Sequence, residues 1–207
     1  MTRKNDKLII SIYDYTGAWA EPYIKAGYPV MLWDKKKEGD ILEGFSSLLM
    51  EIEETGLQVY GLLFAPPCTD FASSGARWWK DKDKKTADLI PFDTQTELSM
   101  SLVLICLHLV SIVKPHFWVL ENPVGRIETI VPELKPFRKM TFNPSDFGDP
   151  YTKKTILWGN FNSNLQKKYV LALMGSLMHK TPPSKKRQEI RSATPKGFAR
   201  AFFEANK

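Results

Sequence analysis

The side chain with the greatest potential for chemistry in this sequence is Cys68, which follows an apolar run and two consecutive prolines, Pro66 and Pro67. The run 57–64 has the length and composition of a buried strand in a parallel sheet. Proline has no amide hydrogen to give to a sheet, so the strand must end there and the cysteine must leave the sheet. Ligands of open α/β sheets bind at the carboxyl ends of the strands, which makes Cys68 a candidate nucleophile. The alternative is a small buried hydrophobic residue.

Three acidic residues are each expected to end a strand: Asp14 after residues 8–13, Asp34 after 29–33 and Glu121 after 117–120. The carboxyl ends of parallel strands share one edge, so these acids and Cys68 are predicted to face one cleft. The apolar residues before Glu121 should partly desolvate its carboxyl group and favour its protonated form. A thiolate can add to an electron-poor ring that a nearby carboxyl group polarises. Acids that only cap turns or form salt bridges are the alternative interpretation.

The strands alternate with segments of helical pattern, which indicates an α/β fold with a mostly parallel, Rossmann-like sheet and helices on both faces. The helices are predicted over 18–26, ended by Gly27, and over 42–54, 93–113 and 195–205; a late strand is predicted over 155–158. Residues 73–92 have almost no periodicity and are predicted to be a long polar loop, of the kind that is often functional.

Length and composition fit one soluble globular domain over residues 1–207, with 43% hydrophobic and 25% charged residues. Two cysteines exclude a disulfide framework and indicate a reducing compartment, and three scattered histidines make a metal site improbable. The charged residues 1–7 precede an apolar run too short for a signal peptide or membrane span. The apolar stretch 98–113 contains serine and histidine, which is typical of a core helix.

The net charge of +6 permits a polyanionic partner. The cations concentrate in three runs, 35–37, 80–85 and 180–191. Solvated surface loops are the alternative explanation for each run.

The turn Asp14-Tyr15-Thr16-Gly17 follows the first predicted strand, where Rossmann-like sheets bind their cofactors. It has one glycine where a dinucleotide fingerprint has three, so the turn does not support pyrophosphate binding. An acid at the end of the second strand, here Asp34, can hold the two hydroxyls of a ribose. These features together predict a nucleoside cofactor without a pyrophosphate.

In combination these motifs resemble the cytosine-C5 DNA methyltransferases, which use S-adenosylmethionine on a class I methyltransferase fold. Pro66-Pro67-Cys68 resembles their nucleophile motif and Glu121-Asn122-Pro123 their Glu-Asn-Val motif. The remaining matches follow in the family's order: residues 11–17 as the first cofactor motif, Asp34 as the ribose-binding acid, Asp40-Ile41 as the pair that contacts adenine, 146–155 as the basic motif and 193–195 as the C-terminal motif.

The resemblance implies that Cys68 attacks C6 of a cytosine flipped out of DNA, that Glu121 engages N3, and that C5 accepts the methyl group. Cofactor-binding residues would be Asp14, Tyr15, Thr16, Gly17, Asp34, Asp40, Ile41 and Pro66. Substrate-binding residues would be Pro67, Ser73, Arg77, Trp78, Asn122, Lys153 and Lys154. The partner would be double-stranded DNA, in the cytoplasm of a bacterium or of a phage-infected host, since such compact forms resemble those carried by phages and restriction-modification systems.

The sequence departs from the family pattern in three places. Thr69-Asp70-Phe71-Ala72 stands where the family usually has Gln-x-Phe-Ser, and residues 151–155 replace its Gln-x-Arg-x-Arg triplet. Lysine keeps the charge of arginine but loses its bidentate geometry. Only residues 160–190 are available for target recognition, where the family inserts a sizeable domain. Three alternative functions therefore stay open: activity on RNA or on a free cytosine nucleotide, transfer of another group, and a non-catalytic nucleic-acid-binding module.

Overall fold

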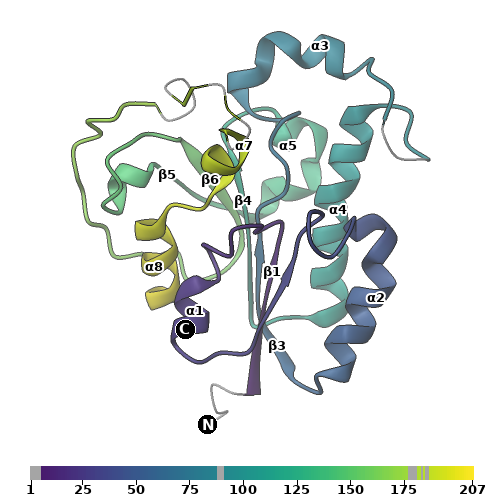
Figure 1. Ribbon diagram of the computed structural model, residues 1–207, viewed down its shortest axis with the longest axis vertical. Coiled ribbons are helices and arrows are strands. Elements are labelled where there is room, and N and C mark those ends of the chain that lie inside the picture. Colours follow the sequence, from purple (N-terminus) through teal and green to yellow (C-terminus); the bar gives the residue numbers. More distant parts are fainter. Residues whose placement is uncertain (1–5, 88–90, 177–180, 183, 185–186) are drawn as a thin grey trace.

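A computed structural model describes residues 6–87, 91–176, 181–182, 184 and 187–207 (Figure 1). Several sequence predictions fall partly outside the described residues: the charged N-terminal segment at 1–5, the polar loop at 88–90, and the basic run and recognition segment at 177–180, 183 and 185–186.

A six-stranded sheet in the order β2-β1-β3-β4-β6-β5 forms the centre of a mixed α/β fold. Its strands are β1 (Lys7–Ile12), β2 (Val30–Trp33), β3 (Gln58–Phe64), β4 (Phe117–Pro123), β5 (Arg138–Phe142) and β6 (Thr155–Asn160). The first four strands are mutually parallel, so their carboxyl ends share one edge, as the sequence predicts.

The other end of the sheet holds its antiparallel strands, which the prediction of a mostly parallel sheet allows. Strand β6 runs antiparallel to both β4 and β5. Strand β5 was not predicted, because Arg138-Lys139-Met140-Thr141-Phe142 lacks a continuous apolar run. It pairs only with β6 at the sheet's edge, where exposed charged side chains are common and discourage pairing with another chain.

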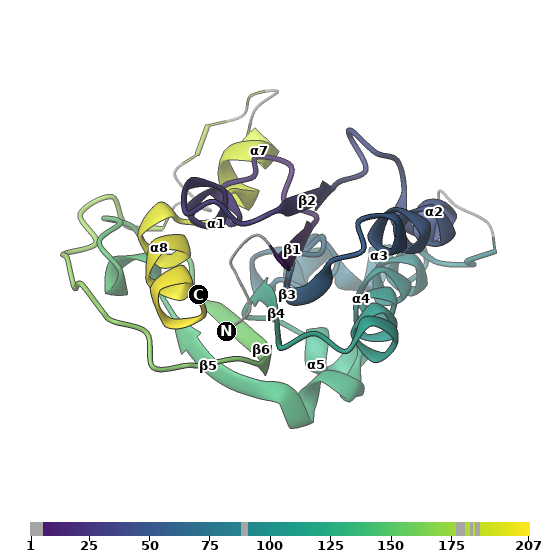
Figure 2. The same cartoon turned by 90° about the horizontal axis from the view of Figure 1, so that it is seen from below.

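Helices cover both faces of the sheet, with α1 and α8 on one face and α2 and α4 on the other (Figure 2). The bounds are α1 (Glu21–Lys25), α2 (Ile41–Glu54), α3 (Trp79–Lys82), α4 (Gln95–Val113), α5 (Ile127–Ile130), α7 (Arg187–Ser192) and α8 (Lys196–Ala205), with the 3-10 turns η2 (Ser73–Trp78), η3 (Pro132–Phe137) and η4 (Pro144–Asp146).

Local chemistry sets the ends of the long helices. Thr94 and Glu97 form a reciprocal capping box at the start of α4, and Asp40 accepts the Leu42 amide at the start of α2. Helix α4 ends at Lys114, whose φ of 46° is left-handed. The helix predicted over 18–26 is shorter in the structure, where it forms only α1. The amides of Trp19 and Ala20, just before α1, donate to the Asp14 carboxylate in a turn.

Helix α4 is long and apolar enough, by length and composition alone, to cross a membrane. Core helices have the same properties, and in this fold α4 packs against α2 and β3. Val103, Cys106 and Leu109 on its inner side are fully buried. The prediction of a core helix over 98–113 is confirmed.

An aromatic cluster on the other face connects the end of the chain to the predicted cofactor turn. Trp19, directly after that turn, has its ring 5.7 Å from Phe198 and 5.8 Å from Phe202, both in α8. All three side chains are completely buried. Each such burial stabilises the fold by roughly 1.5–3 kcal/mol, so α8 helps to fix the turn after β1.

Candidate active site

The turn that carries Cys68 is fixed by its own backbone and by the neighbouring strand. The Cys68 carbonyl accepts hydrogen bonds from the amides of Phe71 at 3.1 Å and Ala72 at 2.9 Å. The Pro66 carbonyl accepts one at 3.0 Å from Nδ2 of Asn122, a buried residue of β4. Cys68 itself is half-buried, four residues beyond the end of β3. The thiol therefore sits on a rigid support at the carboxyl edge.

Glu121 lies within β4, beside this turn, and a buried lysine approaches it. Nζ of Lys153 is 3.4 Å from Oε1 of Glu121, and these side chains are only 4% and 8% exposed. Oε1 has no hydrogen-bond partner, and neither has Oδ1 of the adjacent Asn122, within the part of the chain that the structure describes. Buried oxygen atoms are nearly always satisfied, so the free Oδ1 of Asn122, next to an Oε1 whose one contact is the Lys153 ion pair, suggests a ligand that donates hydrogen bonds.

The three side chains influence one another electrostatically. Burial raises the pKa of the Cys68 thiol, and the negative charge of Glu121 raises it further. The positive charges of Lys153 and, more weakly, Arg191 oppose this rise. The apolar setting predicted for Glu121 was thus incomplete, because a cation lies beside its carboxyl group. The structure brings the predicted residues Cys68, Glu121, Asn122 and Lys153 together.

Two residues near this cluster were missed by sequence reasoning. Tyr151 is half-buried, and its pKa is raised by burial and by the charges of Asp149 and Glu121. Arg191, in α7, is close enough to influence Cys68. The basic character of 180–191 was the only sequence signal for Arg191, and it did not indicate which cation would approach the thiol.

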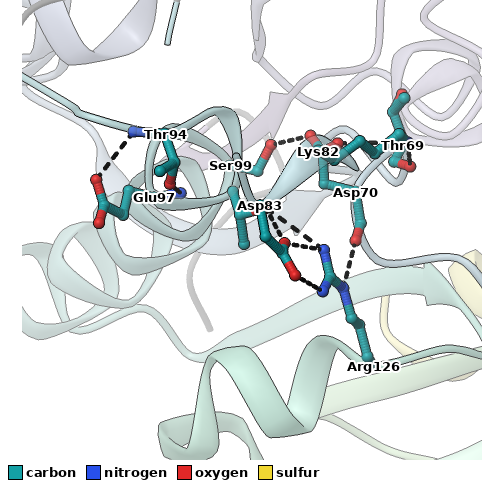
Figure 3. Close-up of polar contacts among 9 residues, drawn as sticks. Thr69, Asp70, Lys82, Asp83, Thr94, Glu97, Ser99 and Arg126 are labelled. Carbon is teal, nitrogen blue, oxygen red and sulfur yellow. Dashed lines mark hydrogen bonds and ion pairs between the residues drawn. The ribbon is translucent and has the colours of Figure 1, made fainter. Parts of the chain in front are cut away.

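Asp70, two residues after the cysteine, is a buried anchor for the same turn (Figure 3). Its carboxylate accepts a hydrogen bond from Ser99 of α4 at 2.6 Å and pairs with Lys82 of α3 at 3.3 Å. Lys82 also donates to the Thr69 carbonyl. This position is one at which the sequence departs from the family pattern, and the departure has a structural use.

Arg126, between β4 and α5, forms a second anchor (Figure 3). Its Nε donates to the Asp70 carbonyl at 2.9 Å, and its guanidinium donates to both oxygens of Asp83 at 2.8 and 2.7 Å. The guanidinium carbon lies 4.8 Å from the centre of the Trp79 ring. The preceding Gly125 approaches the turn so closely that a Cβ atom would lie 1.8 Å from the Phe71 carbonyl oxygen.

These anchors correct the prediction of a long loop without structure over 73–92. Residues 73–82 form η2 and α3, which ion pairs tie to Asp70 and to Arg126 at the start of α5. A hydrogen bond from Thr96 of α4 to Asp83 adds a third tie. Of the residues predicted to contact substrate, Ser73 and Arg77 are exposed, as is the side chain of Trp78, which is 51% exposed. Arg77 stacks over the Trp78 ring at 5.0 Å. The two tryptophans thus differ: Trp79 packs under Arg126, and Trp78 faces solvent.

The first predicted cofactor residue, Asp14, is buried and uses its oxygens within the chain. It accepts the amides of Trp19 at 3.1 Å and Ala20 at 3.2 Å, and the hydroxyls of Ser11 and Thr16. Burial raises the pKa of Asp14, and these hydrogen bonds oppose that rise. Asp14 therefore shapes the turn, while Tyr15, Thr16 and the left-handed Gly17 (φ 68°) form its accessible part.

The acids after β2 differ in the acceptors that they leave for a ligand. Oδ1 of Asp34 accepts the Lys36 amide at 3.0 Å, and its other oxygen has no hydrogen bond to the described residues. Asp40 uses one oxygen to cap α2 and the other to pair with the exposed Lys35 at 2.9 Å. Ile41 is buried in the core. Asp34 thus suits a ribose, whereas Asp40 would first have to lose a weak surface ion pair.

A cavity of about 520 Å³ opens beside the buried cluster. Three predicted substrate-binding residues line it, Ser73, Lys153 and Lys154, together with Asn143, Thr152 and Ser176. Its lining includes neither the predicted cofactor turn nor Cys68 and Glu121, so the cavity adjoins the cluster through Lys153. Pro67 is exposed at the turn, and Pro66 is buried. No group of three or more potential metal ligands occurs among the described residues.

The chain matches no model of a known protein family and no curated protein. It is similar to a solved structure of a prophage-encoded E. coli protein that has been assigned provisionally as a DNA modification methyltransferase. The two share 15% sequence identity, with a TM-score of 0.50 over 78% of this chain and 49% of the other. At this identity the likeness shows a shared fold. This chain spans about half the length of that protein.

The contacts of Arg126 predict that it holds the turn after Cys68 in place. Arg126→Lys keeps the charge but removes the paired hydrogen bonds to Asp83, which we expect to weaken the anchor by about 1.5 kcal/mol. Amide hydrogen exchange of residues 69–83 should then be roughly tenfold faster, as mass spectrometry of peptides would measure. The matched control is Arg138→Lys, whose ion pair with Glu128 is on the surface. Equal protection of 69–83 in both variants would contradict this role.

The charges around Cys68 predict its reactivity toward iodoacetamide. The raised thiol pKa means slow alkylation at neutral pH, with a rate that climbs above the pH at which ordinary thiols ionise. Lys153→Met should raise this pKa further and slow alkylation at pH 8 by about threefold or more, whereas Glu121→Gln should speed it. Lys154→Met is the exposed control. Peptide mapping identifies the modified cysteine, and identical rates in the two lysine variants would refute the assignment.

Proposed function

We propose that this chain transfers a methyl group from S-adenosylmethionine to C5 of cytosine in DNA, through a transient bond between Cys68 and C6. The observation that carries the proposal is the buried cluster of Cys68, Glu121 and Lys153 at the carboxyl edge of the sheet. The solved structure of similar fold, provisionally a DNA modification methyltransferase, supports methyl transfer to DNA as the general activity. The finer assignment to cytosine C5 rests on the residues.

In the proposed reaction, the Cys68 thiolate forms a bond to C6, and the electron pair of the C5–C6 double bond becomes available at C5. Glu121, as the carboxylic acid, donates a hydrogen bond to N3 and so draws electrons from the ring, and the Lys153 charge stabilises the thiolate. S-adenosylmethionine, held by the turn after β1 and by Asp34, would supply the electrophilic methyl group that C5 takes up, with S-adenosylhomocysteine as the leaving group. Loss of the C5 proton to a base then expels Cys68 and restores the double bond.

The unused acceptors of the site fit the cytosine edge. Oε1 of Glu121 and Oδ1 of Asn122 are buried without hydrogen-bond partners among the described residues. The exocyclic amine of cytosine offers two donor hydrogens, whereas thymine has a carbonyl oxygen at the same place. A thymine there would leave Oδ1 of Asn122 unsatisfied, which costs about 1–3 kcal/mol, and would give Oε1 no donor besides Lys153. The site would therefore select cytosine.

The turn after β1 and the end of β2 fit the nucleoside part of S-adenosylmethionine. The available oxygen of Asp34 would accept the ribose hydroxyls, and Tyr15, Thr16 and Gly17 would line the turn that Asp14 shapes. Asp40 and Ile41 would lie on the adenine side, and Pro66 would support the cofactor side of the Cys68 turn.

DNA is the proposed substrate because cations and exposed aromatic surface adjoin the site. Ser73, Arg77, Trp78 and Lys154 would contact the duplex around a flipped cytosine, with Pro67 near the base. The whole chain would act as a single methyltransferase domain, with 160–190 as a reduced recognition segment. A reducing cytoplasm, in a bacterium or a phage-infected cell, would keep the Cys68 thiol reduced.

Covalent trapping tests the mechanism. With S-adenosylmethionine and random-sequence duplexes whose cytosines are replaced by 5-fluorocytosine, we expect a stable protein–DNA adduct, because fluorine at C5 cannot leave as a proton does. Denaturing electrophoresis detects it. The adduct should be lost in Cys68→Ser and kept in Cys106→Ser. If duplex DNA gives no adduct and fluorinated RNA or a fluorinated nucleotide gives one, DNA is not the substrate.

Calorimetry tests the cofactor site separately. Asp34→Ala removes the carboxylate that would bind the ribose, so S-adenosylmethionine should bind at least about tenfold more weakly, since hydrogen bonds to charged groups contribute about 1.5–3 kcal/mol. Glu43→Ala is the matched control, an exposed acid in the first turn of α2. Equal affinity of Asp34→Ala and the unmodified protein would refute the ribose assignment.

A further inference from the structure

The segment 169–174, here called the apolar strip, exposes large hydrophobic side chains in series. The exposed fractions are 69% for Tyr169, 78% for Leu171, 80% for Leu173 and 52% for Met174. Single exposed hydrophobic residues are common on protein surfaces, but a run of them marks an interaction site. The strip is therefore expected to bind another molecule.

The backbone of the strip is held at both ends by hydrogen bonds to neighbouring segments. The amide of Val170 donates to the Ser145 carbonyl at 2.9 Å, and the amide of Met174 donates to the Pro150 carbonyl at 2.9 Å. Directly after the strip, the Gly175 carbonyl accepts the Thr152 amide at 2.8 Å. The hydrophobic side chains are thus displayed on a fixed support, with little conformational entropy to lose on binding.

The strip lies next to the candidate active site. Thr152, which is bonded to its end, precedes the buried Lys153 directly, and Ser176 and Thr152 both line the cavity of about 520 Å³. In Figure 1 the chain after β6 runs along the outer side of β5 toward the end of the molecule where α7 and α3 lie. A molecule bound over the cavity would meet the strip.

Charge identifies the occupant as a polyanion. The sequence contains no aspartate or glutamate between Asp149 and Glu189, and in that interval it carries, besides the buried Lys153, the cations Lys154, Lys167, Lys168, Lys180, Lys185, Lys186 and Arg187. Lys167 and Lys168 come immediately before the strip, and both are exposed. A net charge of +6 also disfavours association of two copies through such a cationic surface. Nucleic acid combines phosphates for the cations with a stack of bases for the apolar side chains.

We infer that the apolar strip is a wedge, which inserts Leu171 and Leu173 into the base stack of duplex DNA beside the target base. Apolar side chains inserted at a base step are a known means of unstacking and kinking a duplex. Here the wedge would compensate for the stacking contacts that the target base loses when it is extruded. This inference rests on the proposed function, since it places the wedge at the site of base flipping.

A kinetic comparison on paired and unpaired targets tests the wedge. The test variant is Leu171→Ser with Leu173→Ser, and the control is Met50→Ser with Ile112→Ser, two exposed hydrophobic residues on α2 and α4. Target sequences are first recovered from adducts with the random duplexes. On a fully paired target we expect the test variant to form the 5-fluorocytosine adduct at least tenfold more slowly. Opposite an abasic site, where the base is already unpaired, its rate should be within about twofold of the unmodified protein.

Equal losses on both targets, or no loss on either, would overturn the wedge. So would a strip-dependent dimer in sedimentation velocity, which would make a second copy the occupant. If the unmodified protein forms no adduct with any duplex, the proposed function fails, and a measurement without chemistry then decides the inference. Plasmid relaxed by topoisomerase in the presence of the unmodified protein should be unwound, and the test variant should unwind it several-fold less at equal bound protein. Equal unwinding by both would overturn the wedge on its own.

Discussion

The hydrogen bond from Asn122 to the Pro66 carbonyl is the contact on which the site depends most. It joins β4 to the segment that leaves β3, at the point where the sheet itself no longer holds them together. Because Glu121 is the neighbour of Asn122 and Cys68 follows Pro66 by two residues, this bond sets the thiol against the carboxyl group. Asp70 and Arg126 then hold the rest of the turn, so the same interactions that close the fold also position the Cys68 thiol.

Burial of a thiol, a carboxyl group and an ammonium group together is costly for stability, since each loses its hydration. The Glu121–Lys153 pair offsets part of that cost, and the unsatisfied Oδ1 of Asn122 leaves part of it in place. Buried charges and acceptors that are only partly compensated cluster at functional sites, where a ligand completes the hydrogen bonds. A purely structural cluster would have been better served by hydrophobic side chains of similar size.

Much of the framework could be predicted from local pattern, because apolar runs that end in turn residues define β1 to β4 and capping residues define α4. The edge strand β5 could not, since one-sided pairing leaves it free to carry charges. Within the site, the sequence indicates which residues could act chemically, but it does not indicate which residues they contact. Nothing near Lys153 in the sequence indicates that it meets Glu121, and nothing near Asp14 indicates that its oxygens bind the amides of its own turn. Both contacts depend on tertiary geometry.

The placement of Lys153 has a consequence for how substrate binding and chemistry are connected. Its neighbour Thr152 is bonded to the end of the apolar strip, and Val124, at the end of β4, donates to the carbonyl of Lys154. Two backbone hydrogen bonds therefore connect the strip and the end of β4 to the segment that carries Lys153, the residue that faces Glu121. If the strip contacts DNA as proposed, that contact acts on the segment that sets the charge beside Cys68.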